Sequence, residues 1–216
     1  MKRSFIIPAI YAGMIMLTII FLRTGAFAAV QKKVSFSPEN FLGNRSNNYQ
    51  HLVRTEISKA LYITNFAYLD SDYRTRENLY NFRNTFSYNL LKGWASNLAF
   101  GVKNPGFYST TSIQYNQKYD AFSYLISSGA TYQSDFTSES FASIQYTPQI
   151  KNDLMAFIKA TFSFNINSKG VTRGIQQFRF GIKSKQFVYG MPGNFDQFSY
   201  NQRMLTNYGI FVRMSY

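Results

Sequence analysis

Apolar and polar residues alternate along most of the chain after residue 29, which is the pattern of an extended strand with two different faces. In 154–166 the even positions hold Leu, Ala, Ile and Phe, whereas the odd positions are mostly polar and include Lys159. The segments 78–90 and 175–183 repeat this alternation, with aromatic rings on one face and Asn, Gln, Ser or Arg on the other. Each segment predicts a β-strand that has one face in an apolar solvent and the other in a polar one.

The same alternation, in weaker form, extends the count to twelve strands. The 188 residues that follow Ala28 allow about 16 residues for each strand and its connection, which suits membrane-crossing strands of ~9–11 residues. Eight strands would leave about 24 residues for each strand and its connection, which is too many. A barrel of ten strands is also possible, because the two shortest candidate strands are weak. The predicted strands are 31–37, 50–58, 61–69, 78–90, 95–103, 106–116, 120–132, 140–148, 154–166, 175–183, 186–191 and 207–216.

The connections between these strands alternate in length. Short connections are predicted at 58–60, 90–94, 116–118, 149–153 and 183–185, and longer polar ones at 70–78, 133–140, 167–174 and much of 192–206. Short turns at one end and long loops at the other are typical of outer-membrane barrels. The predicted fold is therefore all-β, an antiparallel up-and-down transmembrane β-barrel.

A secreted β-sandwich is the soluble alternative, because its strands would alternate as well. Its outer faces would carry more charge than these strands do. Only 15% of the residues are charged and 19% are aromatic, with a mean hydropathy of −0.22, and the polar faces are largely Ser, Thr, Asn and Gln. Aromatic rings at the strand ends also favour an interfacial girdle.

The first 28 residues differ from the rest and predict a signal peptide. Lys2 and Arg3 precede an apolar run over 5–22, and Ala26-Phe27-Ala28 supplies the small-x-small pattern of a cleavage site. Cleavage after Ala28 would leave 29–216 as one barrel domain. An uncleaved anchor helix is the alternative, because the apolar run is long.

The last strand has one apolar face and ends on an aromatic ring. That face consists of Tyr208, Ile210, Val212, Met214 and Tyr216. It resembles the carboxy-terminal signature of bacterial outer-membrane β-barrels, which the barrel assembly machinery recognises. The resemblance implies that these five residues are the assembly signal, that the protein lies in the outer membrane, and that its partners include outer-membrane lipid and lipopolysaccharide. Architecture and charge are also similar to those of small monomeric porins for acidic sugars, and no motif assigns a specific family.

Basic residues outnumber acidic ones, and most of the charged residues predicted to face inward are basic. The chain has a formal net charge of +13, and loss of the first 28 residues leaves 20 basic against 10 acidic residues. On the predicted strands, seven cations and one acid face inward, with Lys33 doubtful: Arg54, Glu56, Arg83, Lys103, Lys159, Arg179, Lys183 and Arg213. The other acids are predicted in loops, turns or strand ends: Glu39, Asp70, Asp72, Glu77, Asp120, Asp135, Glu139, Asp153 and Asp196.

Seven cations cannot be buried away from water with only one carboxylate as a partner, because unpaired buried charge carries a heavy desolvation cost. The sequence therefore predicts a narrow, water-filled lumen whose cations attract small anionic solutes or ions. The eight inward residues are its predicted pore lining. A plugged structural or adhesive barrel without transport is the first alternative, and an outer-membrane lipid-modifying enzyme is the second.

The sequence contains few candidates for a catalytic or cofactor-binding site. The chain has no cysteine, and its one histidine, His51, stands in no recognisable catalytic motif, so a structural role is predicted for it. Asp70, Asp72 and Glu77 are spaced too loosely to indicate a calcium loop. We expect no enzyme activity, no cofactor and no metal site. We also expect no nucleic-acid partner, because no basic patch stands on one folded module and the chain is exported.

Overall fold

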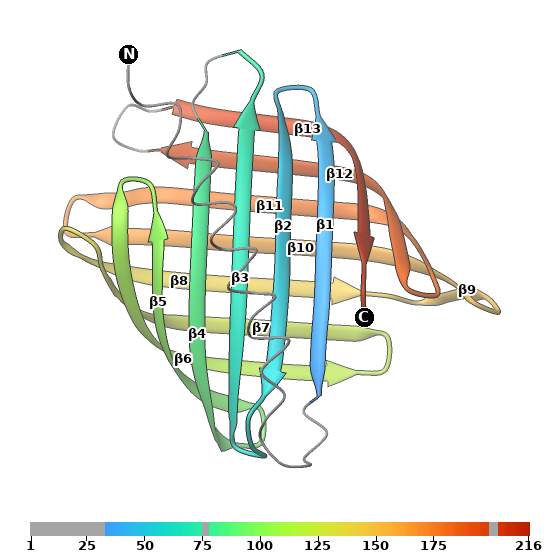
Figure 1. Ribbon diagram of the computed structural model, residues 1–216, viewed down its shortest axis with the longest axis horizontal. Helices are drawn as coiled ribbons and strands as arrows, with labels where there is room; N and C mark the ends of the chain where they lie inside the picture. Colours follow the sequence, from blue (N-terminus) through green and yellow to red (C-terminus); the bar gives the residue numbers. More distant parts are fainter. Residues whose placement is uncertain (1–32, 75–77, 199–202) are drawn as a thin grey trace, which may run out of the picture. The chain divides into compact units, whose positions relative to one another are not determined.

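A computed structural model of the chain describes residues 33–74, 78–198 and 203–216 (Figure 1). The predicted signal peptide and Glu77 lie outside the described residues. The described residues form no helix long and apolar enough to cross a membrane. Their strands form one antiparallel sheet that closes on itself, because the first strand, β1, pairs with the last, β13.

Twelve long strands make the barrel, as the sequence predicts, and one short strand is added to it. The short strand, β9 (Gln149–Lys151), pairs only with β10. In Figure 1, β1 to β4 run across β7, β8, β10 and β11 of the opposite wall. The twelve strands are β1 (Val34–Gly43), β2 (Ser46–Glu56), β3 (Leu61–Asp72), β4 (Leu79–Leu91), β5 (Trp94–Lys103), β6 (Gly106–Tyr119), β7 (Phe122–Tyr132), β8 (Phe136–Tyr146), β10 (Leu154–Asn167), β11 (Gly170–Ser184), β12 (Phe187–Phe198) and β13 (Arg203–Met214).

The predicted contrast between long and short connections is mostly wrong. At the end of the barrel that holds the C-terminus, called the C-terminal end below, the connections are 57–60, 92–93, 120–121, 147–153 and 185–186. At the other end, called the far end, they are 44–45, 73–78, 104–105, 133–135, 168–169 and 199–202. Much of the predicted loops 133–140, 167–174 and 192–206 is therefore strand.

The two weakest predicted strands are full-length strands in the structure. Residues 38–43 complete β1 and residues 192–198 complete β12. Both stretches were predicted outside the strands, because Pro, Glu, Asn and Asp are rare in strands that pack against an apolar core. Here the polar side chains at alternate positions point into the barrel, where they have polar partners.

The outer surface of the barrel is apolar and carries two aromatic belts. Exposed rings near the C-terminal end are Tyr88, Trp94, Tyr119, Phe122, Tyr146, Phe187 and Tyr216. Exposed rings near the far end are Phe107, Tyr132, Phe136 and Tyr208. Exposed aliphatic and aromatic side chains between the belts include Leu98, Ile113, Ile126, Ile144, Ile158, Phe180 and Val212. An apolar band between aromatic girdles is the surface that a lipid bilayer requires of a barrel.

The seam between β1 and β13 closes the barrel. It is in register from Glu39 opposite Arg213 to Gly43 opposite Gly209. Beyond the last paired residues, the backbones of Phe36 and Tyr216 exchange two hydrogen bonds of 3.2 and 3.0 Å. Their rings stack with centroids 6.4 Å apart and planes 15° apart. The C-terminal residue therefore extends the seam to the C-terminal end of the barrel.

Replacement of Tyr216 by aspartate should reduce the amount of folded barrel in the outer membrane, because it removes the stacking contact and places a charge at the membrane interface. Deletion of 207–216 should abolish insertion, since no strand would then pair with β1. Folded barrel is measured by heat-modifiable mobility of the membrane fraction. Tyr119→Asp is the matched control, because Tyr119 is 57% exposed and Tyr216 62%, both at the C-terminal end. Equal losses in the two variants would contradict a special role for Tyr216.

Candidate functional site

Hydrogen bonds between strands that are not neighbours identify the inner face of the barrel. Arg83 on β4 donates to Glu139 on β8 at 2.7 Å. Arg179 on β11 donates to Glu39 on β1 at 2.9 Å. Such bonds can only pass through the lumen, because two or more strands separate each pair in the wall. Side chains therefore bridge the interior at more than one place.

Glu39 is the centre of the largest of these clusters. Its carboxylate accepts from Arg179 on one oxygen, and Arg213 donates to the other through Nε at 2.8 Å and through a guanidinium nitrogen. Gln50 also donates to it, at 2.7 Å. Glu39 is 2% exposed and Arg179 3% exposed. Charge-assisted hydrogen bonds of this kind are the strong ones, and the carboxylate is completely enclosed by donors.

An apolar cluster packs against the two arginines. It consists of Phe41, Phe157, Val188 and Phe211, all buried. The guanidinium of Arg213 lies 5.1 Å from the ring centroid of Phe157, and that of Arg179 lies 5.4 Å from Phe41. These rings hold the guanidinium groups by cation–π contact and exclude water from one side of them. This part of the wall is packed as a protein core.

Lys159 lies beside this cluster and has no partner of its own. It stands opposite Arg179 in the β10–β11 register, and its electrostatic neighbours are Arg213, Glu39 and Arg179. Among the described residues, its ammonium makes no hydrogen bond or ion pair. Three cations therefore gather around one carboxylate, and the carboxylate is already bonded to two of them.

The second lumen-crossing pair, Arg83 with Glu139, is part of a polar network on the opposite wall. Thr131 donates to Glu139 at 3.1 Å and contacts the hydroxyl of Thr110 at 2.7 Å. Lys103 lies over the ring of Tyr108 at 4.5 Å. The network ties β4, β6, β7 and β8 together at a level where the inner side chains are buried.

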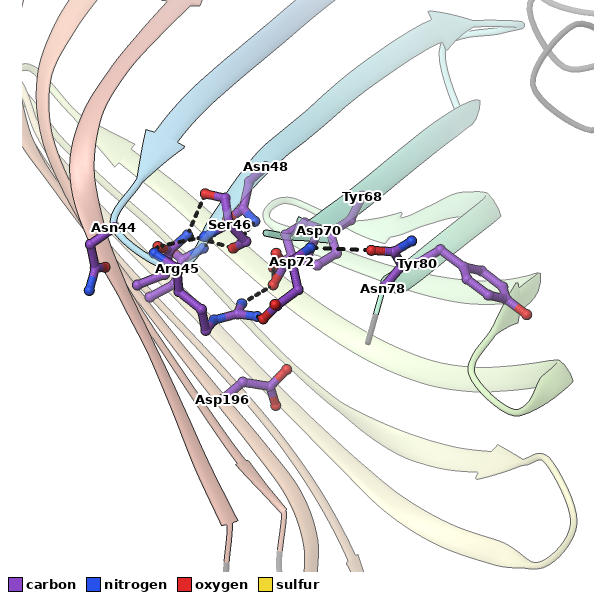
Figure 2. Close-up of polar contacts among 12 residues, drawn as sticks. Asn44, Arg45, Ser46, Asn48, Tyr68, Asp70, Asp72, Asn78, Tyr80 and Asp196 are labelled. Carbon is purple, nitrogen blue, oxygen red and sulfur yellow. Dashed lines mark hydrogen bonds and ion pairs between the residues drawn. The ribbon is translucent and has the colours of Figure 1, made fainter. Parts of the chain in front are cut away.

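A third cluster lies at the far end, around the turn between β1 and β2 (Figure 2). Arg45 reaches from this turn to Asp70, and to Asp72 at 2.8 Å. The side chain of Asn207 on β13, 2% exposed, accepts from the backbone N–H of Arg45 at 3.0 Å and donates to the hydroxyl of Ser46 at 2.8 Å. A side chain on Gly43 would overlap the carboxamide of Asn207, which would then have to leave its bonds to the turn. This cluster fixes the turn against the seam.

The inner faces of β2 and β6 become more exposed toward the C-terminal end. On β2, Ser46 and Asn48 are buried, whereas Leu52 is 41% exposed and Arg54 and Glu56 are exposed. On β6, the inner positions 108, 110 and 112 are buried, and 116 and 118 are exposed. This side of the lumen is therefore enclosed toward the far end and more open to solvent toward the C-terminal end.

All eight residues of the predicted pore lining lie on strands and on the inner face. The clusters described above include four of them: Arg83, Arg179, Arg213 and Lys159. Lys103 lies over the ring of Tyr108, in the wall that holds the Arg83 network. Arg54 lies 3.8 Å over the ring of Tyr62. Glu56 and Lys183 are on the inner positions of β2 and β11. That they line a conducting pore stays a prediction.

The predicted ratio of seven inward cations to one acid is wrong. Glu39, Glu139 and Asp196, which the sequence placed in loops or strand ends, are inner-face strand residues with arginine partners. Asp70 and Asp72 also face inward at the far end of β3. Glu39 could have been found only from its partners, which are 140 and 174 residues away in sequence. Arg173, paired with Asp196 at 3.0 Å, is likewise an inner residue that the prediction missed.

His51 lies on the outer face, away from the acids of the lumen. Its ring nitrogens contact the Tyr49 hydroxyl at 3.1 Å and the Asn65 carboxamide oxygen at 3.0 Å. In the part of the chain that the structure describes, no group of three or more His, Cys, Asp and Glu side chains could hold a metal ion.

No model of a protein family matches the chain, and no curated protein matches it either. A solved structure described as KdgM porin is similar, with a TM-score of 0.54 and 10% identity over 84% of this chain and 99% of that one. OmpT of Vibrio cholerae with loop L8 deleted, an outer-membrane protein, has a TM-score of 0.40 and 7% identity over 87% of this chain and 100% of that one. The first likeness shows the fold. It confirms the predicted antiparallel β-barrel, and the apolar outer surface is of the kind that faces lipid.

Glu39→Gln should destabilise the barrel strongly, because it leaves Arg179, Arg213 and Lys159 without a carboxylate. Removing one partner from a buried charge cluster typically costs about 3–5 kcal/mol. The free energy of unfolding is measured in urea with the fluorescence of Trp94, the chain's one tryptophan. Glu56→Gln is the matched control on an exposed inner position, with an expected change of about 0.5 kcal/mol or less. Similar effects of both variants would contradict the central place of Glu39.

Proposed function

We propose that the barrel is a narrow, water-filled pore that passes small anionic solutes. Lys159 carries this proposal. It is an inner-face cation near the middle of β10 that has two arginines beside it, and the nearby carboxylate of Glu39 is already bonded to both. A cation in this position is stable only with water or an anion next to it. Its field acts inside a low-dielectric wall and favours anions over cations.

The ion pairs of the interior restrict the pore rather than line it uniformly. Arg83 and Arg179, which the sequence offers as selectivity residues, are bonded to Glu139 and Glu39. The charge of Arg83 is therefore largely compensated, whereas Arg179 shares the one carboxylate of Glu39 with Arg213. The inner cations that have no acidic hydrogen-bond partner among the described residues include Arg54, Lys103, Lys159 and Lys183. An anion that enters from the C-terminal end would meet Arg54 first and Lys159 deeper in the lumen.

A closed structural barrel is the second candidate, and the lumen-crossing bonds favour it. The pair between β4 and β8 and the cluster between β1 and β11 fill part of the cross-section. Twelve strands lie between the ~8 whose lumen side chains can fill and the ~16 that leave a wide channel. The two candidates differ in whether ions cross the barrel.

The partners expected from the sequence belong to the same proposal. The apolar face of β13, from Tyr208 to Val212, and the terminal Tyr216 point outward and would be recognised by the barrel assembly machinery. Lipid and lipopolysaccharide would contact the apolar band and the belts. An enzyme of the outer membrane would need a nucleophile or base in reach of substrate, and His51 already bonds Tyr49 and Asn65 on the outer face.

In planar bilayers under a salt gradient, the wild-type barrel should show a reversal potential that favours the anion. Lys159→Glu should shift it toward the cation, with about a tenfold fall in the anion-to-cation permeability ratio, since ~1.4 kcal/mol at the constriction is a factor of ten. Lys159→Gln should give a smaller shift in the same direction. Lys151→Glu, on exposed β9, is the control and should leave the potential unchanged, because salt screens its charge.

No conductance in the wild type would contradict the pore and support the closed barrel. Conductance with the same selectivity in wild type and in Lys159→Glu would show that Lys159 does not face the path of the ions. Heat-modifiable mobility shows whether each variant is folded before its conductance is measured.

A further inference from the structure

A row of polar side chains crosses the lipid-facing surface of three neighbouring strands. His51 on β2, Asn65 on β3 and Asn84 on β4 lie near the middle of their strands. The register places them outside, because their strand neighbours Gln50, Phe66 and Arg83 face the lumen. Bulky polar side chains at this depth are costly in lipid, so their presence needs a reason. We call this row, together with Tyr49, the outer polar row.

The side chains of the outer polar row form a directed chain of hydrogen bonds. The Asn65 amide donates to the Asn84 carboxamide oxygen at 2.8 Å. The Asn65 oxygen lies 3.0 Å from His51 Nε2, so that nitrogen donates to it. In the neutral imidazole, Nδ1 then accepts, and the Tyr49 hydroxyl 3.1 Å away donates to it.

The two ends of this chain have opposite hydrogen-bonding needs. At the β4 end, the Asn84 amide has two N–H groups, and neither has a side-chain acceptor among the described residues. At the β2 end, the Tyr49 hydroxyl oxygen keeps free lone pairs after donating to His51. Acyl chains can satisfy neither end. A partner must therefore offer an acceptor opposite β4 and a donor opposite β2.

We propose that the outer polar row is the interface of a twofold dimer in the membrane, and that its occupant is a second copy of this chain. A twofold axis along the membrane normal, placed at β3, puts β2 of one copy opposite β4 of the other. The donor end of each row then meets the acceptor end of its partner, and the match occurs twice. A twofold axis of this kind also keeps each residue at the same membrane depth.

The neighbours of the row include small and aromatic side chains. Ala67 lies next to Asn65 on the outer face of β3, between His51 and Phe82, and is covered by its own neighbours. The polar side chains of the row therefore stand out from this surface, where polar groups can bond across a membrane interface. Phe36, which packs edge-on against His51, adds apolar contact at the rim.

Cysteine cross-linking of the full chain in native outer membranes tests this dimer, since the wild-type chain has no cysteine. Ile63→Cys places a thiol on the outer face of β3 without changing the row. A short bis-maleimide should convert this variant to a covalent dimer whose mass is twice that of the chain. Phe180→Cys, an exposed outer position on β11, is the matched control and should stay monomeric.

Removing the donor at the β4 end of the outer polar row tests whether its hydrogen bonds stabilise the dimer. Asn84→Leu in the Ile63→Cys background should reduce the dimer by about tenfold or more, as expected for a loss of ~1.4 kcal/mol. Gln176→Leu, on an outer position of β11, should leave it unchanged. Equal cross-linking at positions 63 and 180, no dimer at position 63, or a cross-link to a protein of another mass would each overturn the proposal. If Asn84→Leu does not fold, the comparison of positions 63 and 180 still decides. Pore conductance does not enter the result, so the outcome is independent of the proposed function.

Discussion

The interior of the barrel depends on one carboxylate, that of Glu39. A buried anion is stable only when its oxygens are bonded to charged or polar donors, and here Arg179, Arg213 and Gln50 supply them. These residues come from β1, β2, β11 and β13. The same carboxylate therefore bonds two arginines, of whose charge it compensates one unit, and joins strands on both sides of the seam. Without it, the aromatic cluster under the arginines would have to pack against uncompensated charge.

The two faces of every strand are governed by different solvents, and this constraint explains both the alternation and its exceptions. Outside, lipid accepts apolar groups and penalises free donors, so the aromatic belts and the aliphatic band follow the strand period. Inside, a charged side chain is tolerated when it has a partner of opposite charge or is in contact with water. Arg213 near the end of the last strand is thus consistent with its apolar neighbours Val212 and Met214, because its side chain faces the lumen and theirs face outward.

The sequence predicts the fold well and the interior poorly, for a physical reason. Alternation within a strand is local, so strand number, the inner face and the closing strand can be recognised from the sequence. Ion pairs across the lumen are not local: Arg83 and Glu139 are 56 residues apart, and Arg179 is 140 residues from Glu39. The stretch around Pro38 and Glu39 has no apolar alternation and was predicted to be a loop. In the structure it is a strand, because its acid points to arginines that only the closed barrel brings near.

In the proposed pore, the pairing of interior charges would shift selectivity toward the cations that have no carboxylate of their own. Glu139 compensates Arg83, whereas Glu39 is shared by Arg179 and Arg213, so that cluster keeps a positive charge even before Lys159 beside it is counted. Arg54, near the C-terminal end of β2, is exposed, so water and salt can screen its charge. In the proposed pore, the strongest field on a passing ion would therefore arise near the middle of β10. The ion pairs would fix the shape of the passage, and the ammonium of Lys159 would set which sign of charge it favours.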